Sequence, residues 1–232
     1  MLPTDAVKEF QNASRERLYP SIINPNWLVL RKRRELFRHW LEGSLSKGGT
    51  VLDIGGRIQP YRTLLPETRY LAIDLRVTPL VNVVANAERI PFPSQGFDLV
   101  LCTQMLEYAP DPGLVLSEIH RVLKPGGRVL LSVPSVFPQD AEEDRWRFLP
   151  AGIRQLLSAF SEVEIVPEGG SIAGFFRTIN VCLHMFAKYS AIRTVLSYTV
   201  IPALNLMGLG LEEIARSRNE AFAVNYSAMA RK

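Results

Sequence analysis

The sequence predicts an α/β fold, a doubly wound and mostly parallel seven-stranded sheet with helices on both faces. Short apolar runs alternate with helix-like segments, which is the pattern of a parallel sheet crossed over by helices. The first run, Thr50 to Ile54, leads directly into Gly55-Gly56. Paired glycines let the backbone turn sharply and approach a ligand closely. In open α/β sheets, small molecules bind at this end of the strands.

Seven apolar runs bounded by Pro, Gly, Asn or Asp are strand-like. Only Arg76 to Pro79 separates the second run from the third, whereas a parallel crossover normally takes a dozen residues or more. The third run is therefore either a short edge strand reached by an extended link, or not a strand. The runs cover residues 50–54, 70–75, 80–85, 97–102, 128–133 and 162–166, and lie within 221–232 at the end of the chain.

Helix signals fill the intervals between these runs. One helix is expected from Asn24-Pro25 to about Leu45, and Pro60 suits the first turn of another after the glycine turn. Asp111 is placed to cap a third helix, which Pro125-Gly126-Gly127 ends. Residues 151–160 carry the apolar spacing of a fourth helix.

Composition indicates one globular domain with ordinary surface chemistry. The 232 residues are 47% hydrophobic and 22% charged, with a net charge of +4. The basic run Arg31 to Arg38 alternates with apolar residues at helical spacing, so it is interpreted as the solvated face of a helix rather than a nucleic-acid site. Two cysteines, Cys102 and Cys182, predict neither a disulfide framework nor a metal site. A reducing cytoplasm is expected, and the first residues do not resemble a signal peptide.

The predicted domain covers residues 25–232 and is preceded by a polar, irregular arm, residues 1–24. An apolar, mostly helical insertion, residues 171–219, precedes the last strand. Thr194 to Leu211 lack charge for 18 residues, the lower limit for a membrane span. A single span would separate residues 221–232 from the sheet. Residues 172–211 are therefore interpreted as two or three helices that cap the active-site edge, lie on a membrane surface or form a homodimer face.

Four segments resemble a known family when taken together. They read "VLDIGG", "YLAIDL", "ANAERIPFPSQGFDLVLCTQMLEY" and "APDPGLVLSEIHRVLKPGGRVLLSVP". In this order and spacing they resemble the class I S-adenosylmethionine-dependent methyltransferases, and within them the type 11 group. The resemblance is strong over about residues 50–134 and weak up to Val166. It implies S-adenosylmethionine as the cofactor.

The resemblance also implies which residues hold that cofactor. Asp74 matches the acid that binds the two ribose hydroxyls, which one carboxylate can accept together. Asn86 stands where the family usually has Asp beside the adenine. Residues 102–104 match the segment that faces the methionine part. The implied cofactor-binding set is Asp53, Gly55, Gly56, Asp74, Leu75, Asn86, Ala87, Glu88, Cys102 and Gln104.

Several positions depart from the family pattern. Arg57 and Gln59 occupy places in the glycine turn that are usually small. Arg57 either intrudes on the cofactor, pairs with its carboxylate or points outward, and the outward orientation is expected. Tyr108 stands where many members carry His.

The residues for catalysis and for the acceptor are less defined by the sequence. Glu107, Tyr108 and Asp144 are candidates for the base that a hydroxyl acceptor requires. Trp146 and Arg147 either flank the acceptor or pin their loop to the core.

The predicted function is methyl transfer to a small, glycan or lipid-linked acceptor, at oxygen. Neither nucleic acid nor a metal is expected, and the protein is expected in the cytoplasm or peripheral to a membrane. The alternative is a catalytically degenerate methyltransferase-like protein that serves as a binding or scaffolding partner. An oxidoreductase is disfavoured because the G-x-G-x-x-G fingerprint is missing.

Overall fold

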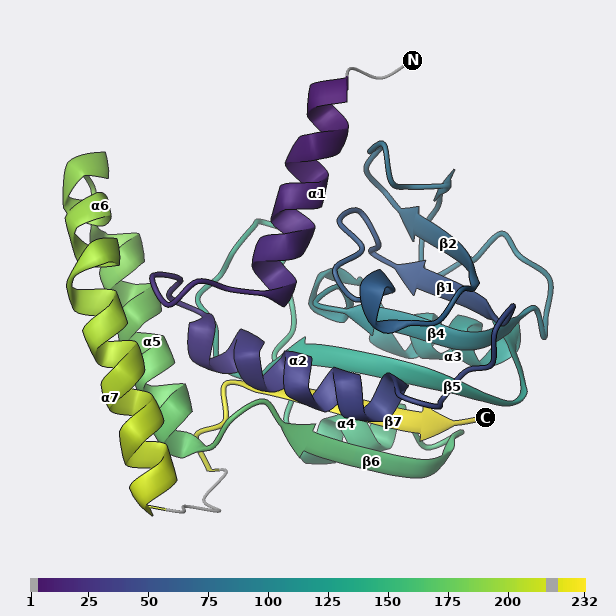
Figure 1. Cartoon of the computed structure of the whole chain (residues 1–232). Coiled ribbons are helices and arrows are strands. Elements are labelled where there is room, and N and C mark those ends of the chain that lie inside the picture. The colour runs from purple at the N-terminus through teal and green to yellow at the C-terminus, as the bar shows by residue number, and fades with distance from the viewer. Residues whose placement is uncertain (1–3, 216–220) are drawn as a thin grey trace.

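The computed structural model describes residues 4–215 and 221–232. A seven-stranded sheet runs through the molecule in the order β3-β2-β1-β4-β5-β7-β6 (Figure 1). Strand β7 is antiparallel to its neighbours β5 and β6, and the other pairs are parallel. The strands are β1 Thr50–Ile54, β2 Arg69–Asp74, β3 Val83–Val84, β4 Phe97–Thr103, β5 Leu123–Pro134, β6 Ser161–Pro167 and β7 Asn225–Arg231.

The fold class predicted from the sequence is confirmed, and the ambiguous third run is a two-residue edge strand. Val83 and Val84 pair with Ile73 and Asp74 of β2. The link to this strand turns at residues 79–80, where the backbone N–H of Val81 donates to the carbonyl of Thr78 at 3.2 Å. The Asn82 side chain then joins the link to β2 by accepting from the backbone N–H of Ala72 at 2.8 Å. An edge strand reached in this way needs no crossover helix.

Helices cover both faces of the sheet (Figure 1). Helix α2 (Trp27–Leu41) packs Phe37, Trp40 and Leu41 onto one face, where it contacts β7 and the Trp40 indole N–H donates to Glu164 of β6 at 3.0 Å. Helices α3 (Pro112–Val122) and α4 (Pro150–Leu156) cover the other. The Asp111 side chain caps α3 by accepting from the N–H groups of Gly113 and Leu114. Burial of apolar side chains on both faces explains why β1 and β4 read as continuous apolar runs.

Two local predictions were wrong. The residues expected to be an irregular arm contain helix α1 (Thr4–Leu18), whose Leu18 is buried against the core. The glycine turn leads not into a long helix but into one 3₁₀ turn, η1 (Arg62–Leu64). Gln59, with φ +47°, holds this turn by donating its side-chain amide to the carbonyl of Leu80. The chain therefore leaves β1 as a structured loop.

The predicted insertion forms three helices, α5 (Ser171–Phe186), α6 (Ser190–Tyr198) and α7 (Val200–Ala215). Helices α6 and α7 follow one another in a column that packs beside α5 (Figure 1). The buried side chain of Asn205 accepts from Asn180 at 2.9 Å and donates to the carbonyl of Ile22 at 2.7 Å. This polar contact fixes α5 and α7 to the segment between α1 and α2.

Gly174 is required where α5 passes the segment before β7. A Cβ at this position would overlap the carbonyl oxygen of Phe222. We expect Gly174→Ala to lower the free energy of unfolding by about 1 to 3 kcal/mol, because overpacking forces the backbone apart. Gly152→Ala in α4 is the matched control, since that Cβ would meet open space. Urea denaturation should show the control unchanged or stabilised by up to about 1 kcal/mol. Equal effects would contradict this close approach.

Candidate active site

A cavity of about 170 Å³ lies at the carboxyl ends of β1, β4 and β5. Asp53 and Gly55 line it from β1, Gln104 from the end of β4 and Pro134 from β5. Its opposite wall comes from α1, α2 and α5, including Arg177 of α5. The insertion therefore reaches the active-site edge as expected, but the side chain it contributes to the cavity is a cation.

Asp53 is a buried acid beside the glycine turn. It accepts a hydrogen bond from the Tyr70 hydroxyl at 2.6 Å. Burial raises its pKa to about 7, against the lowering effect of the Tyr70 hydrogen bond. A Cβ on Gly56 would lie 2.8 Å from the Asp53 carboxyl carbon, so glycine lets the turn pass close to this acid.

The turn itself is held by β2. Gly55, with φ +75°, and Gly56 both donate their backbone N–H to the carbonyl of Ile73, at 2.9 and 3.2 Å. Arg57 is exposed and lines the cavity, and the expected outward orientation of its side chain stays a prediction. Its carbonyl accepts from the Thr78 hydroxyl at 3.3 Å. The arginine thus stands at the cavity edge, and its side chain stays accessible to solvent.

The residues expected to hold the adenosine lie beside the cavity, outside its lining. Asp74 is half-buried and accepts from the backbone N–H of Arg76 at 2.8 Å through one carboxylate oxygen. Leu75, directly after it, is 71% exposed. Asn86 accepts from the Glu88 backbone N–H at 2.9 Å, and Glu88 in turn accepts from that of Asp111 at 2.8 Å. These contacts hold the Asn86–Glu88 loop close to the start of α3, and Ala87 packs against the core on that face.

The end of β4 separates two of the predicted residues. Cys102 is fully buried in the core on the α3 face, where burial raises its thiol pKa, and it does not line the cavity. Gln104 does line it, with φ +51°. Its backbone N–H donates to the carbonyl of Ser132 at 2.7 Å. Thr103, which the sequence did not single out beyond its place between the two, also lines the cavity, because side chains alternate along a strand.

Glu107 is the buried acid of the cavity. It is 4% exposed, and its Oε2 has no hydrogen-bond partner within the part of the chain that the structure describes. Burial raises its pKa to about 7. The backbone N–H groups of Arg145 and Trp146 donate to the Glu107 carbonyl at 2.9 and 3.2 Å, which fixes the position of the residue.

The other two candidates for a base are engaged elsewhere. Burial and the neighbouring Asp140, to which the Tyr108 hydroxyl donates at 3.0 Å, raise the tyrosine pKa. Asp144 forms an ion pair with Arg147 at 2.5 Å, and this contact lowers the Asp144 pKa. A base must be able to take up a proton near neutral pH. Glu107 has the pKa best suited to that role.

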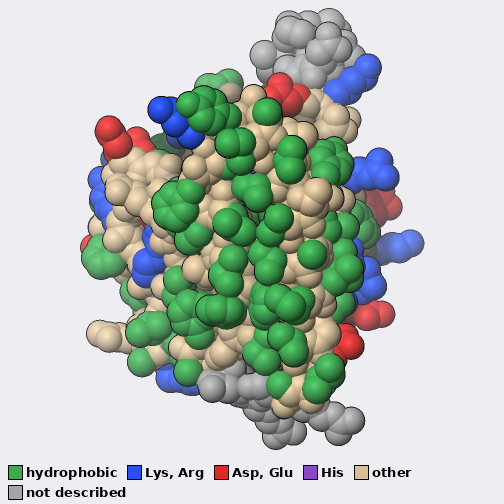
Figure 2. Space-filling model, turned by 90° about the vertical axis from the view of Figure 1, so that its left-hand side faces the viewer, with side chains coloured by type: hydrophobic (Ala, Val, Ile, Leu, Met, Phe, Trp, Pro, Cys, Tyr) green, Lys and Arg blue, Asp and Glu red, His purple; other side chains and the backbone are tan. Residues whose placement is uncertain are grey.

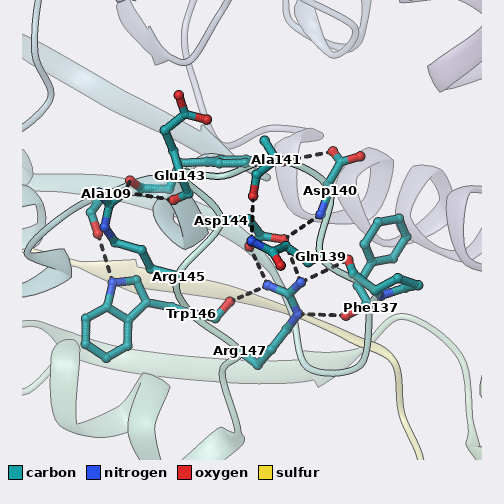
Figure 3. Close-up of polar contacts among 12 residues, drawn as sticks. Ala109, Phe137, Gln139, Asp140, Ala141, Glu143, Asp144, Arg145, Trp146 and Arg147 are labelled. Carbon is teal, nitrogen blue, oxygen red and sulfur yellow. Dashed lines mark hydrogen bonds and ion pairs between the residues drawn. The ribbon is translucent and has the colours of Figure 1, made fainter.

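The loop after β5 is tied together by Arg147 and Trp146 (Figure 3). Arg147 binds Asp144 and donates to the carbonyls of Phe137 and Pro138, both at 3.1 Å. The indole N–H of Trp146 donates to the carbonyl of Ala109 at 2.8 Å. Of these two residues only Arg147 lines the cavity. Trp146 therefore pins the loop, and Arg147 both orders the loop and faces the cavity.

Sequence reasoning missed three arginines of the cavity wall, Arg17, Arg33 and Arg177. Arg33 lies in the basic run interpreted as a solvated face, yet it is 2% exposed and paired with Glu168 at 2.7 Å. The helical period offered a signal, since Arg33 lies four residues before the fully buried Phe37. Arg177 gave a weaker signal as a lone charge within an apolar helix.

The comparisons with known proteins agree with this arrangement. The family described as "Methyltransferase domain" matches residues 62–131. "Probable methyltransferase PMT21" of Arabidopsis thaliana is 31% identical over 63% of this chain and 22% of its own length. Ubiquinone biosynthesis O-methyltransferase of Pseudomonas putida is 32% identical over 40% of this chain and 48% of its own. The ubiquinone/menaquinone biosynthesis C-methyltransferase UbiE of Haemophilus ducreyi is 30% identical over 64% of this chain and 55% of its own length.

Solved structures share the fold. A methyltransferase from Archaeoglobus fulgidus, described as S-adenosylmethionine dependent, superposes with a TM-score of 0.54 at 18% identity, covering 95% of this chain and 99% of that chain. The chain thus resembles methyltransferases in its residues 62–131 and has the fold of class I S-adenosylmethionine-dependent methyltransferases. The [4+2]-cyclase SpnF has the same fold, with a TM-score of 0.56, 18% identity and coverage of 98% and 93%. The shared fold therefore does not by itself identify the reaction. The chain spans between about a fifth and a half of the length of the curated relatives it matches.

The residues present fit the cofactor of this methyltransferase family. An exposed leucine beside a half-buried acid suits an adenosine, because the apolar side chain can contact the base while the carboxylate accepts from the ribose. Asp74 Oδ2 has no hydrogen-bond partner among the described residues, so it is free to accept from such a hydroxyl. Arg57, exposed at the cavity edge, leaves this surface open.

The raised pKa of Glu107 predicts a pH dependence of stability. In the folded chain its pKa is about 7, against an ordinary value of 4.5, so ionisation opposes folding. The contribution of Glu107 is most favourable below pH 4.5 and is lost as pH rises towards 7. We expect the free energy of unfolding of Glu107→Gln, relative to wild type, to increase by up to about 3 kcal/mol over this window. Urea titrations at several pH values measure it.

Glu142→Gln is the control for this measurement, because it makes the same change at an exposed side chain on the neighbouring loop. Its stability relative to wild type should stay flat with pH. A flat response of Glu107→Gln as well would show that Glu107 is not held in a desolvated site.

Proposed function

We propose that this protein transfers a methyl group from S-adenosylmethionine to a hydroxyl oxygen of a small, glycan or lipid-linked acceptor. The observation that supports it most is the placement of Glu107. A buried carboxyl with an open oxygen and a pKa of about 7 lines the same cavity as the ends of β1 and β4. That position suits a base acting beside a cofactor held at the glycine turn.

The chemistry asks the protein mainly for alignment. When bound, S-adenosylmethionine supplies an electrophilic methyl group on a sulfonium. Holding the reacting groups in line can contribute about 7 to 11 kcal/mol. Gln104 and the ordered loop after β5 position the acceptor, and Glu107 accepts the hydroxyl proton through Oε2. A positioned base of matched pKa contributes roughly 10²- to 10⁴-fold in rate.

Transfer to oxygen is favoured over other acceptor atoms for the same reason. A hydroxyl must lose its proton during attack, and Glu107 is the side chain suited to take it. The names of the relatives include both an O-methyltransferase and a C-methyltransferase. The preference for oxygen is therefore argued from the cavity residues and not from similarity to these proteins. A scaffolding protein without catalysis is the second candidate, motivated by Arg57, Asn86 and Tyr108 at positions that differ from the family.

Cofactor binding separates these two candidates. We expect S-adenosylhomocysteine to bind with micromolar affinity, about 8 kcal/mol, in calorimetric titration. Asp74→Ala should weaken it by roughly 10- to 100-fold, because charge-assisted hydrogen bonds contribute about 1.5 to 3 kcal/mol. Glu67→Gln, an exposed acid before β2, is the control and should bind as wild type does. Absence of binding by the wild-type protein would favour the scaffold.

We also propose that the insertion rests on an anionic membrane surface. Hydrophobic side chains gather over α5–α7, with charged groups at the edges of this face (Figure 2). Residues 190–215 are long and apolar enough to cross a membrane, and only 17% of the most apolar window is buried. Because β7 returns to the sheet between β5 and β6, contact along the surface fits better than a single span. The exposed residues of this outer apolar face are Phe175, Met185, Phe186, Tyr189, Ile192, Val195, Tyr198, Leu206, Met207, Leu211 and Ile214.

Charge is unevenly distributed along the insertion. Lys188 and Arg193 are both exposed where α5 meets α6, whereas the acids Glu212 and Glu213 lie near the end of α7. Cations next to an apolar helix face attract anionic headgroups.

Co-sedimentation with vesicles tests this contact. Wild type should bind phosphatidylglycerol vesicles more strongly than phosphatidylcholine vesicles. The double variant Val195→Glu, Ile214→Glu should bind at least about tenfold more weakly, since each side chain loses about 1.5 to 3 kcal/mol of apolar burial. Leu114→Glu in α3 is the control, because that leucine is 52% exposed and lies outside the insertion. Unchanged vesicle binding by the double variant would contradict membrane contact. So would a wild-type dimer in solution that the double variant no longer forms.

A further inference from the structure

Arg177 is a buried cation without a carboxylate in direct contact. It is 4% exposed. Its Nε donates to the side chain of Asn26 at 2.9 Å, its Nη1 donates to the carbonyl of Val136 at 3.1 Å, and its guanidinium lies 4.4 Å from the ring centroid of Phe137. All three partners are neutral. Burying a charge without a compensating partner lowers the free energy of unfolding by roughly several kcal/mol, even after the protein relaxes around the charge.

Two other arginines of the cavity differ in this respect. Arg147 is paired with Asp144, and Arg33 with Glu168. Burial, together with the nearby positive charge of Arg33, lowers the pKa of Arg177 to about 9. Arg177 is still charged at neutral pH, so Arg33, Arg177 and Glu168 together leave one buried positive charge in excess.

Arg33 supplies a second guanidinium to the same cavity. It binds Glu168 through Nε and Nη2. Arg33 and Arg177 both line the cavity. Two guanidiniums that line one cavity, with one unmatched positive charge between them, form a site with the chemistry to bind an oxyanion.

The position of this pair points to the acceptor rather than the cofactor. Val136 and Phe137, which hold Arg177, follow β5, two strands along the sheet from the glycine turn of β1. Glu107 lines the cavity that both regions share. An anion bound at Arg177 would therefore belong to a molecule that presents its hydroxyl to Glu107.

We propose that Arg177 and Arg33 bind an oxyanion of the methyl acceptor, a phosphate or a carboxylate, so that the acceptor is an anionic hydroxyl compound. This proposal rests on the methyl-transfer function above and narrows its substrate class. The pair fixes the anion, and the acceptor hydroxyl then lies toward Glu107. The cationic wall that α5 contributes gives the insertion a direct role in acceptor binding.

The test measures anion binding to protein saturated with S-adenosylhomocysteine, using inorganic phosphate, acetate and short-chain phosphatidic acid below its micellar concentration as probes. We expect at least one probe to raise the thermal midpoint of wild type. Arg177→Gln should bind that probe at least about tenfold more weakly, a change of about 1.4 kcal/mol. A larger effect of phosphatidic acid than of phosphate indicates a lipid acceptor, equal effects indicate a soluble phosphorylated one, and acetate alone indicates a carboxylate.

Arg154→Gln in α4 is the matched control, because it removes the same charge from an exposed side chain away from the cavity. It should bind each probe as wild type does. Arg177→Lys keeps the charge but loses the planar fork, and should bind the anion with intermediate affinity. This second variant retains the test if Arg177→Gln does not fold.

Two results would overturn the proposal. One is an equal response of wild type and Arg177→Gln to every probe. The other is a folded Arg177→Gln that binds S-adenosylhomocysteine tenfold or more weakly, which would assign the arginine to the cofactor carboxylate. Failure of wild type to bind S-adenosylhomocysteine at all would instead remove the methyl-transfer function, and the two failures are therefore distinct.

Discussion

The buried ion pair between Arg33 and Glu168 connects helix α2, which lines the cavity, to the residue that follows β6. Arg33 comes from α2, and Glu168 follows β6. The second oxygen of Glu168 accepts from the hydroxyls of Ser132 in β5, at 2.6 Å, and Ser227 in β7, at 2.5 Å. A buried ion pair is maintained only when its remaining hydrogen-bonding capacity is met, and here every Glu168 oxygen is bonded.

The cavity combines two kinds of group that burial affects in opposite ways. Burial raises the pKa of the acids Asp53 and Glu107 to about 7, so a proton can enter or leave them near neutral pH. The buried arginines remain charged at that pH. This asymmetry divides the site into a part that exchanges protons beside the glycine turn and β4, and a part beside β5 and α5 that attracts anions.

Much of the fold could be predicted from the sequence because strand and turn signals are local. The β1 strand was predicted to the residue, and the Asp111 cap of α3 forms as expected. The 3₁₀ turn that replaces the helix expected at Pro60 could not be predicted from local signals. Gln59 holds this turn through a contact with Leu80, 21 residues further along the chain. The cationic wall was missed because a basic run on a helix is usually solvated. Only the tertiary position of Glu168 shows that Arg33 is buried.

A crystal structure with S-adenosylhomocysteine bound would test the central claim most directly, because it locates the cofactor sulfur relative to the cavity. We expect the adenosine to lie on Leu75 with its ribose hydroxyls on Asp74, and the sulfur to face the cavity on the side of Glu107. A complex in which the guanidinium of Arg57 occupies that space, with the ligand elsewhere and Asp74 unengaged, would contradict the enzymatic function.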